Sequence, residues 1–565
     1  HSESPGTGHS EGCPTSGAVN ETLGAKVVID WLNGRAKAYT SRTGDVEAPP
    51  VTWHNGKTAM MGTSYNGTIP IAAATTGVEG LAAIVPISAI SDWYDYYRAN
   101  GTVRAPHQSS GGNGNNNFQG EDADVLADLV YSRQDEIEAR RQGGGACREL
   151  IDEMMAEVDR ATGDRTAFWE QRNYMKDVAN IKAATLIAHG GNDFNVMTKH
   201  AARLYEALKK QGTPHMFYFH QGGHGGAPPD FLLNLWFTKY LWGQDNGVEN
   251  LPRSWVVRET DACPPREATV IGDHVNTADL TVSSTAPFRV GYTLTVPQLN
   301  ANGSTTNTTR VITNIEGNTL TLASPVATGA GQRVADGATV FLACSNANPT
   351  PYPEWPDPAT EDATLRLSPG GDERGGLTLG LGSGEPETLT DDSAVTATTA
   401  MNTVPHPARL VYQTDVLTRP VRISGTPRVS LRAAFSKPKA NLSVYLLSLP
   451  GGSGNGTILT RGWIDPENRT SDRTSEPVTP GEFYRLNVDL QPKDTVVPAG
   501  RRLGLMVMST DRDYLVRPAP GTQVTVDIAQ TTFTLPIVGG AGALAPAIGE
   551  GIAEEETEVS GTVPP

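Results

Sequence analysis

The stretch K-T-A-M-M-G-T-S-Y-N-G, residues 57–67, decides the fold. Its apolar run predicts a buried strand, and the glycines that follow predict a sharp turn into a helix with Ser64 at the apex. Gly62 and Gly67 flank the serine because a strained turn leaves no room for side chains on the adjacent strand and helix. The Tyr65 N–H, at the helix start, would then face a developing oxyanion. The stretch indicates a nucleophilic serine.

Taken alone, the pattern G-x-S-x-x-G is a weak signal, because a chain with 60 glycines contains such patterns by chance. The alternative is an ordinary surface turn between a strand and a helix. The interpretation depends on whether the rest of the chain supplies an acid and a base in the right order.

Length and charge narrow the classes of protein. A chain of 565 residues is too long for one core, and about three or four domains are expected. The net charge of -17 argues against nucleic acid or an anionic membrane as a partner. No apolar run is long enough to span a bilayer. The four cysteines lack zinc-site spacing, and their even number fits two disulfides and a secreted or extracellular protein, with a cytoplasmic enzyme as the alternative.

Strand and helix patterns alternate along the first 250 residues, which predicts an α/β domain with a parallel sheet. Helices are expected at 18–34 and 198–210, and strands at 81–87, 183–189 and 215–219. Residues 105–118 are rich in glycine, serine and asparagine and predict a loop. The charged segment 121–173 predicts two or three helices that form a cap.

An acid and a base follow two of the predicted strands. Asp193 comes after the strand at 183–189, and His224 lies in a glycine-rich loop after the strand at 215–219. Because the carboxyl ends of parallel strands meet at one edge of a sheet, both should lie near Ser64. The order serine, acid, histidine is that of α/β-hydrolases. The competing residues, which suit these roles less well, are His54, His189, His200, His215 and His220, and Asp92, Asp95, Asp122 and Asp124.

Beyond residue 242 the pattern changes to short alternating strands, which predicts an all-β region. Residues 267–343 read as a small β unit, and a disulfide between Cys263 and Cys344 would tie its neck. The predicted domains are a core at 1–104 and 176–250, a cap at 105–175, a β-sandwich at 251–535 with an insertion at about 264–345, and a disordered tail at 536–565.

The chain resembles the Xaa-Pro dipeptidyl-peptidase family of serine peptidases, which is grouped with cocaine-esterase-like hydrolases. The segments that carry this resemblance are S-P-G-T-G-H-S-E-G-C-P-T-S-G (4–17), G-T-S-Y-N-G (62–67), I-S-D-W-Y-D-Y-Y-R-A-N-G (90–101), F-Q-G-E-D-A-D-V-L-A (118–127), F-W-E-Q-R-N-Y (168–174) and H-G-G-N-D-F-N-V (189–196). The resemblance implies an α/β-hydrolase domain with a helical cap, followed by a C-terminal jelly roll. The insertion departs from the family pattern.

The resemblance also implies roles for individual residues. Ser64 would be the nucleophile, His224 the general base and Asp193 the residue that orients the base, with the Tyr65 N–H as an oxyanion donor. The residues expected to bind substrate are Trp93 and Tyr96 around proline, Glu121 or alternatively Asp122 at the free ammonium, and Asn195 at the first carbonyl.

The implied reaction releases dipeptides from peptides with proline at the second position, through an acyl-enzyme. No metal or organic cofactor is implied. The family takes a second oxyanion donor from upstream of residue 4, so an upstream segment is expected from a precursor or another chain; a homodimer is left open. The alternatives are an esterase or α-amino-acid ester hydrolase with the same triad, and an inert secreted binding protein.

Overall fold

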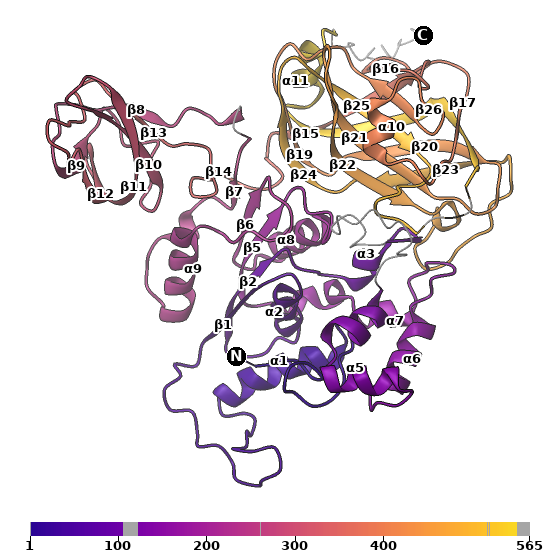
Figure 1. Ribbon diagram of the computed structural model, residues 1–565, viewed down its shortest axis with the longest axis horizontal. Helices are drawn as coiled ribbons and strands as arrows, with labels where there is room; N and C mark the ends of the chain where they lie inside the picture. Colours follow the sequence, from indigo (N-terminus) through magenta and orange to yellow (C-terminus); the bar gives the residue numbers. More distant parts are fainter. Residues whose placement is uncertain (1, 105–121, 260–261, 517, 519, 551–565) are drawn as a thin grey trace, which may run out of the picture. The chain divides into compact units, whose positions relative to one another are not determined.

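The computed structural model describes residues 2–104, 122–259, 262–516, 518 and 520–550 (Figure 1). The chain forms two compact units. The first comprises His1–Trp93, Tyr131–Ala146 and Arg172–Trp355, and the second comprises Tyr94–Val130, Cys147–Gln171 and Pro356–Pro565. Among the described helices, none is both long enough and apolar enough to cross a membrane.

The first unit contains the predicted α/β sheet. Its strands are β1 (Thr58–Thr63), β2 (Leu81–Ile87), β5 (Ala184–Gly190), β6 (His215–His220), β7 (Ser254–Val256) and β14 (Thr350–Tyr352), in that spatial order. The first five are parallel, and β14 runs antiparallel to β7. Every residue of β5 and β6 is buried, as expected for central strands of a parallel sheet. The predicted parallel sheet is confirmed.

Helices alternate with these strands, as the sequence predicts. They are α1 (Val19–Leu32), α2 (Tyr65–Thr75), α8 (Lys199–Gln211) and α9 (Asp230–Trp242). The helix α8 is capped by Gly212, whose φ of 74° is the left-handed conformation that favours glycine. The cap ends the helix, and β6 starts three residues later and runs parallel to β5.

A second sheet is inserted between β7 and β14. It consists of β8 (Glu267–Thr269), β13 (Thr339–Phe341), β10 (Thr293–Leu299), β11 (Thr305–Glu316), β12 (Thr319–Val326) and β9 (Thr277–Thr281), in that spatial order. The predicted boundary at residue 251 is wrong, because β7 and β14 extend the α/β sheet on either side of the insertion. Sequence patterns miss these strands because each is only three residues long.

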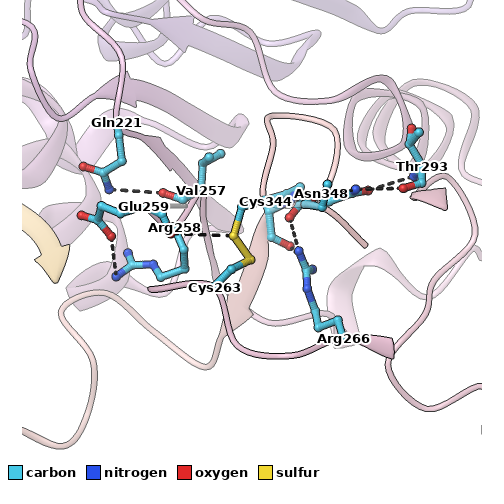
Figure 2. Close-up of a disulfide and its surroundings, with 11 residues drawn as sticks. Gln221, Val257, Arg258, Glu259, Cys263, Arg266, Thr293, Cys344 and Asn348 are labelled. Atoms are coloured by element: carbon cyan, nitrogen blue, oxygen red, sulfur yellow. Dashed lines mark hydrogen bonds and ion pairs between the residues drawn. A yellow bond between two sulfur atoms is a disulfide. The ribbon is translucent and has the colours of Figure 1, made fainter. Parts of the chain in front are cut away.

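The neck of the insertion is closed by a disulfide between Cys263 and Cys344, with Cα atoms 5.9 Å apart (Figure 2). This pairing was expected from the positions of the two cysteines. Beside it, Arg266 donates to the Asn348 carbonyl, and the Asn348 side chain bonds both backbone groups of Thr293. These contacts join the two chain segments of the neck to each other and to the start of β10.

The helical segment contains α4 (Ala123–Val125), a π-helical turn (Leu126–Tyr131), α5 (Gln134–Arg141), α6 (Arg148–Glu157) and α7 (Ala167–Glu170). The expected helices are therefore present. They do not form one separate cap, since Tyr131–Ala146 belongs to the first unit and Cys147–Gln171 to the second. The predicted loop at 105–118 lies outside the described residues.

The second unit is dominated by a twelve-stranded sheet, which confirms the predicted C-terminal all-β domain. Its strands are β15 (Thr360–Ser368), β16 (Gly375–Thr378), β17 (Glu387–Thr390), β18 (Leu410–Gln413), β19 (Val421–Gly425), β20 (Arg428–Phe435), β21 (Leu442–Pro450), β22 (Thr457–Ile464), β23 (Phe483–Asp489), β24 (Lys493–Val497), β25 (Arg501–Met508) and β26 (Gln523–Val538). The helix α10 (Ala397–Asn402) precedes β18. The helix α3 (Trp93–Tyr97), at the boundary between the two units, precedes the small hairpin of β3 (Arg98–Ala99) and β4 (Thr102–Val103).

The prediction of a disordered tail from residue 536 is wrong for its first part. The strand β26 continues to Val538, and α11 (Gly540–Ala547) follows. Leu544, Ala547 and Ile548 are buried in the core of the all-β domain. The Ala- and Gly-rich composition suggested disorder, but the apolar side chains of this segment pack into the core of the all-β domain and stabilise the helix. Residues 551–565 lie outside the described part.

Removing the neck disulfide should destabilise the inserted sheet. A C263A/C344A variant loses a cross-link between residues 81 apart, and the greater freedom of the unfolded chain should cost about 2–4 kcal/mol. Chemical denaturation of the variant and the wild type, followed by limited proteolysis within 264–343, would measure this. Equal denaturation midpoints and equal cleavage rates would contradict it.

Candidate active site

The turn between β1 and α2 forces Ser64 into a strained backbone conformation, with φ 63° and ψ -128°. A Cβ on Gly62 would lie 2.3 Å from the Asn66 carbonyl oxygen, and one on Gly67 would lie 2.6 Å from that of Gly62. Only glycine fits at either position. The Tyr65 N–H begins α2 and, within the described residues, makes no hydrogen bond. It is therefore free to donate to a bound oxyanion.

The loops after β5 and β6 lie side by side and carry Asp193 and His224. Backbone hydrogen bonds join them, from Gly191 N to His220 O at 2.7 Å and from Asn192 N to Gly222 O at 3.0 Å. His224 Nδ1 lies 2.8 Å from Asp193 Oδ2. Because a carboxylate accepts, Nδ1 carries the proton, and Nε2 is the bare nitrogen that can take one up.

The Asp193 carboxylate is fully buried and held on its other side. Its Oδ1 accepts from the backbone N–H groups of Asn195 and Val196, both at 3.0 Å. His189 Nε2 is 3.6 Å from Oδ2 but donates to the Val196 carbonyl at 2.9 Å. Burial lowers the pKa of His189 and keeps it neutral. The carboxylate is thus left to pair with His224, whose side chain is 29% exposed.

The nucleophile turn and the histidine loop meet at the end of β2. Ser64 N donates to Ile87 O at 2.8 Å, and Gly225 N donates to Ser88 Oγ at 3.0 Å. A Cβ on Gly225 would be 3.9 Å from the Thr63 methyl group. The Ser64 hydroxyl makes no hydrogen bond to His224 in the described part of the chain, and such contacts often form only when substrate is bound.

Aromatic side chains surround the residue after the nucleophile. The Tyr65 ring packs edge-on against Trp93, with centroids 5.0 Å apart, and against Tyr131 at 4.7 Å. Its hydroxyl donates to the buried carboxylate of Glu21, and burial together with that carboxylate raises the pKa of Tyr65 well above its usual value. Trp93 is fully buried, and its Nε1 donates to the Tyr174 hydroxyl at 3.2 Å.

Glu21 was not singled out from the sequence. Besides Tyr65, its carboxylate accepts from the backbone N–H groups of Thr15 at 2.9 Å and Gly17 at 3.0 Å. In the sequence it resembles any acidic residue in the first turn of a helix. Only the folded chain brings the loop at 15–17 and the start of α2 around one carboxylate.

The predicted substrate-binding residues are distributed over both units. Tyr96 is buried in the second unit, where its carbonyl accepts from Arg104 at 2.6 Å. The Asn195 side chain is half-buried next to Asp193 in the first unit, and Glu121 lies outside the described residues.

Asp122 does not suit the alternative role of ammonium ligand. Its buried carboxylate pairs with Arg98 at 2.9 Å and Arg160 at 3.2 Å, and it caps α4 by accepting from Ala123 N. Two guanidinium groups already compensate its charge, which gives Asp122 a structural role. Among the described residues, no cluster of acidic, histidine and cysteine side chains could hold a metal ion.

Fold and site together define an α/β-hydrolase-like protein with a C-terminal all-β domain. Residues 1–226 match the family described as X-Pro dipeptidyl-peptidase (S15 family), and residues 332–545 match its C-terminal non-catalytic domain. The chain belongs to this family. It is 41% identical to a putative Xaa-Pro dipeptidyl-peptidase of Rhodopirellula baltica, over 96% of this chain and 72% of that protein. The one from Bacillus anthracis is 35% identical over 95% and 72%. The predicted resemblance is confirmed.

Solved structures share the fold at low sequence identity. An α-amino acid ester hydrolase has a TM-score of 0.56 and 17% identity over 94% of this chain and 84% of its own. A CocE/NonD family hydrolase from Staphylococcus aureus has a TM-score of 0.58 and 12% identity over 94% and 78%. Most of the inserted sheet falls in residues 227–331, which neither family match covers.

An added methyl group at the nucleophile turn should abolish activity. In G67A the new Cβ would collide with two carbonyl oxygens, which forces the turn to shift and should cost about 1–3 kcal/mol of stability. The matched control is G542A, an exposed position in α11 with no atom within 4 Å of the added group. Hydrolysis rates and melting temperatures of both variants would test this, and an active G67A would refute the steric explanation.

Proposed function

We propose that the chain is a serine peptidase that releases N-terminal Xaa-Pro dipeptides from peptides through an acyl-enzyme. The observation that carries this proposal is the hydrogen bond between His224 Nδ1 and Asp193, at the sheet edge where Ser64 is held in its strained turn. Membership of the Xaa-Pro dipeptidyl-peptidase family supplies the substrate class.

In this mechanism Ser64 Oγ attacks the prolyl carbonyl carbon, and His224 Nε2 takes the serine proton. The negative charge on the carbonyl oxygen is stabilised by the Tyr65 N–H, which has no other acceptor among the described residues. His224 then passes the proton to the departing amine. Water hydrolyses the dipeptidyl ester with the same histidine as base, while Asp193 stabilises its charged form.

Substrate selection needs two further features. We propose that Trp93 and Tyr96 form the walls against proline, since a flat ring without N–H is selected by shape and desolvation. Glu121 would bind the free ammonium and Asn195 the first carbonyl. The pairing of Asp122 with two arginines leaves Glu121 as the carboxylate of that segment for the ammonium.

Two proposals concern the surroundings of the enzyme. A second oxyanion donor would come from a further segment beside β1, because β1 is the edge strand of its sheet and a groove of about 740 Å³ adjoins it and Tyr65. The protein would act outside the cell or in another oxidising compartment, because no described cysteine is free.

The triad is tested by hydrolysis of Gly-Pro p-nitroanilide. The S64A variant should lose both turnover and covalent labelling by a fluorophosphonate probe. The D193N variant should lower kcat about 10⁴-fold, because the amide no longer holds the active tautomer of His224. D245N, at a 95% exposed carboxylate, is the control and should behave like the wild type. Labelling of S64A at the wild-type rate would show that another residue is the nucleophile.

The ammonium site is tested by blocking the substrate's amine. N-acetyl-Gly-Pro p-nitroanilide should have a kcat/KM about 10- to 150-fold lower than the free amine, which corresponds to a charge-assisted hydrogen bond of about 1.5–3 kcal/mol. E121Q should reduce hydrolysis of the free amine and leave the acetylated substrate unchanged. Equal rates for the two substrates would contradict an ammonium anchor, and faster hydrolysis of phenyl esters than of either would favour an ester hydrolase.

A further inference from the structure

The loop that carries His224 is wrapped around the side chain of a second histidine. His220 is the last residue of β6 and is buried. Its Nδ1 accepts from Gly222 N at 3.1 Å, and its Nε2 donates to Gly225 O at 2.8 Å. An amide can only donate and a carbonyl can only accept, so the ring is neutral with its proton on Nε2. One imidazole thus joins the backbone on both sides of His224.

The glycines of this loop are required by their closeness to the His220 ring. A Cβ on Gly222 would lie 2.8 Å from Nδ1, and one on Gly226 would lie 2.2 Å from Nε2. At the end of the neighbouring strand β5, a Cβ on Gly190 would lie 2.9 Å from Cε1. A loop this rich in glycine could swing if no side chain packed against it. The structure instead shows a loop packed against a buried ring.

Ser88 holds the same loop from the side of the nucleophile. It follows β2 in the left-handed region, with φ 46°, and is fully buried. Its Oγ accepts from Gly225 N at 3.0 Å, and the preceding residue, Ile87, accepts from Ser64 N at 2.8 Å. Two consecutive residues therefore connect the backbone of the nucleophile to the backbone next to the base.

We propose that His220 and Ser88 are positioning residues: both bond to Gly225, and through it they keep the His224 imidazole where it can take up the Ser64 proton in the substrate complex. This inference rests on the proposed function. Both His220 nitrogens are occupied by backbone groups, so the ring has no lone pair or proton left for the reaction. Its effect is exerted through the loop.

A positioning role predicts a loss in the chemical step and not in binding. Misplacement of a reacting group by about 1 Å can cost 10²-fold in rate. H220A removes both backbone contacts and should lower kcat about 100-fold on Gly-Pro p-nitroanilide. KM should stay within about twofold of the wild-type value, because neither residue contacts the substrate in the proposed mechanism.

Partial replacement separates the two contacts. In H220N the amide oxygen can take the place of Nδ1 and accept from Gly222, while the bond to Gly225 is lost. This variant should keep more of kcat than H220A. S88A removes the contacts of Ser88 Oγ, which accepts from Gly225 N at 3.0 Å and donates to Gly225 O at 3.4 Å. The double variant H220N/S88A should lose less than the product of the two single losses, since both act on one residue.

The control is H215N, at a buried histidine in the same strand whose Nδ1 bonds the Thr213 carbonyl and, among the described residues, no other group. It should change the melting temperature without changing kcat. If H220N and S88A merely destabilise the fold, they will resemble H215N, and the proposal is then wrong.

Labelling by a fluorophosphonate separates this inference from the choice of substrate. The reaction forms a bond from Ser64 Oγ to phosphorus, releases fluoride and needs His224 as base, but it needs no peptide. The labelling rate should fall in H220A and S88A by about the same factor as kcat. A wild type that labels but does not cleave Gly-Pro p-nitroanilide would refute the proposed peptidase. Wild-type labelling rates in H220A, H220N and S88A would refute the positioning role instead.

Discussion

Parallel pairing of β1, β2, β5 and β6 is the constraint on which the site depends. Each strand of such a sheet ends at the same edge, so the loops that follow them converge whatever the distance along the chain. The register places the ends of β1 and β2 together, and those of β5 and β6 together. Ser64, Asp193 and His224 each follow the end of one of these strands. The parallel sheet therefore brings the three loops to one edge before any contact between the loops is made.

Convergence of the loops alone does not orient the side chains that they carry. Backbone hydrogen bonds between the segments after β5 and β6 bring Asp193 close to His224. Every residue other than proline has these backbone groups, so the sequence does not reveal where such bonds form. The two amides on Asp193 Oδ1 fix the carboxylate, which in turn selects the tautomer of His224 with a bare Nε2. The strand pattern alone therefore does not orient His224; the contacts between the loops, the two amides and the Asp193 carboxylate are also needed.

Buried charges in this protein are compensated locally. Glu21 is surrounded by three residues that donate to it, and Asp122 by two arginines. The two carboxylates nevertheless differ in consequence. Glu21 accepts from the hydroxyl of Tyr65, the residue that follows the nucleophile, so it fixes the position of the Tyr65 ring next to Ser64. Asp122 stabilises the helical segment through Arg98 and Arg160, and its carboxylate is therefore not available as a ligand for the substrate's ammonium.

By itself the sequence determined the α/β class, the strand and helix order, the turn at Ser64 and the all-β region, because these follow from hydrophobic period and local backbone sterics. It also predicted Asp193 and His224, which a hydrogen bond joins in the structure, and the turn that carries Ser64 at the same sheet edge. The three-residue strands β7 and β14, the helix α11 and the contacts of Glu21, His220 and Ser88 were decided by tertiary structure. The strands β7 and β14 form because they pair with neighbouring strands, and α11 forms because its apolar side chains pack into the core of the all-β domain. The side chains of Glu21, His220 and Ser88 bond backbone groups that come close to them only in the folded chain.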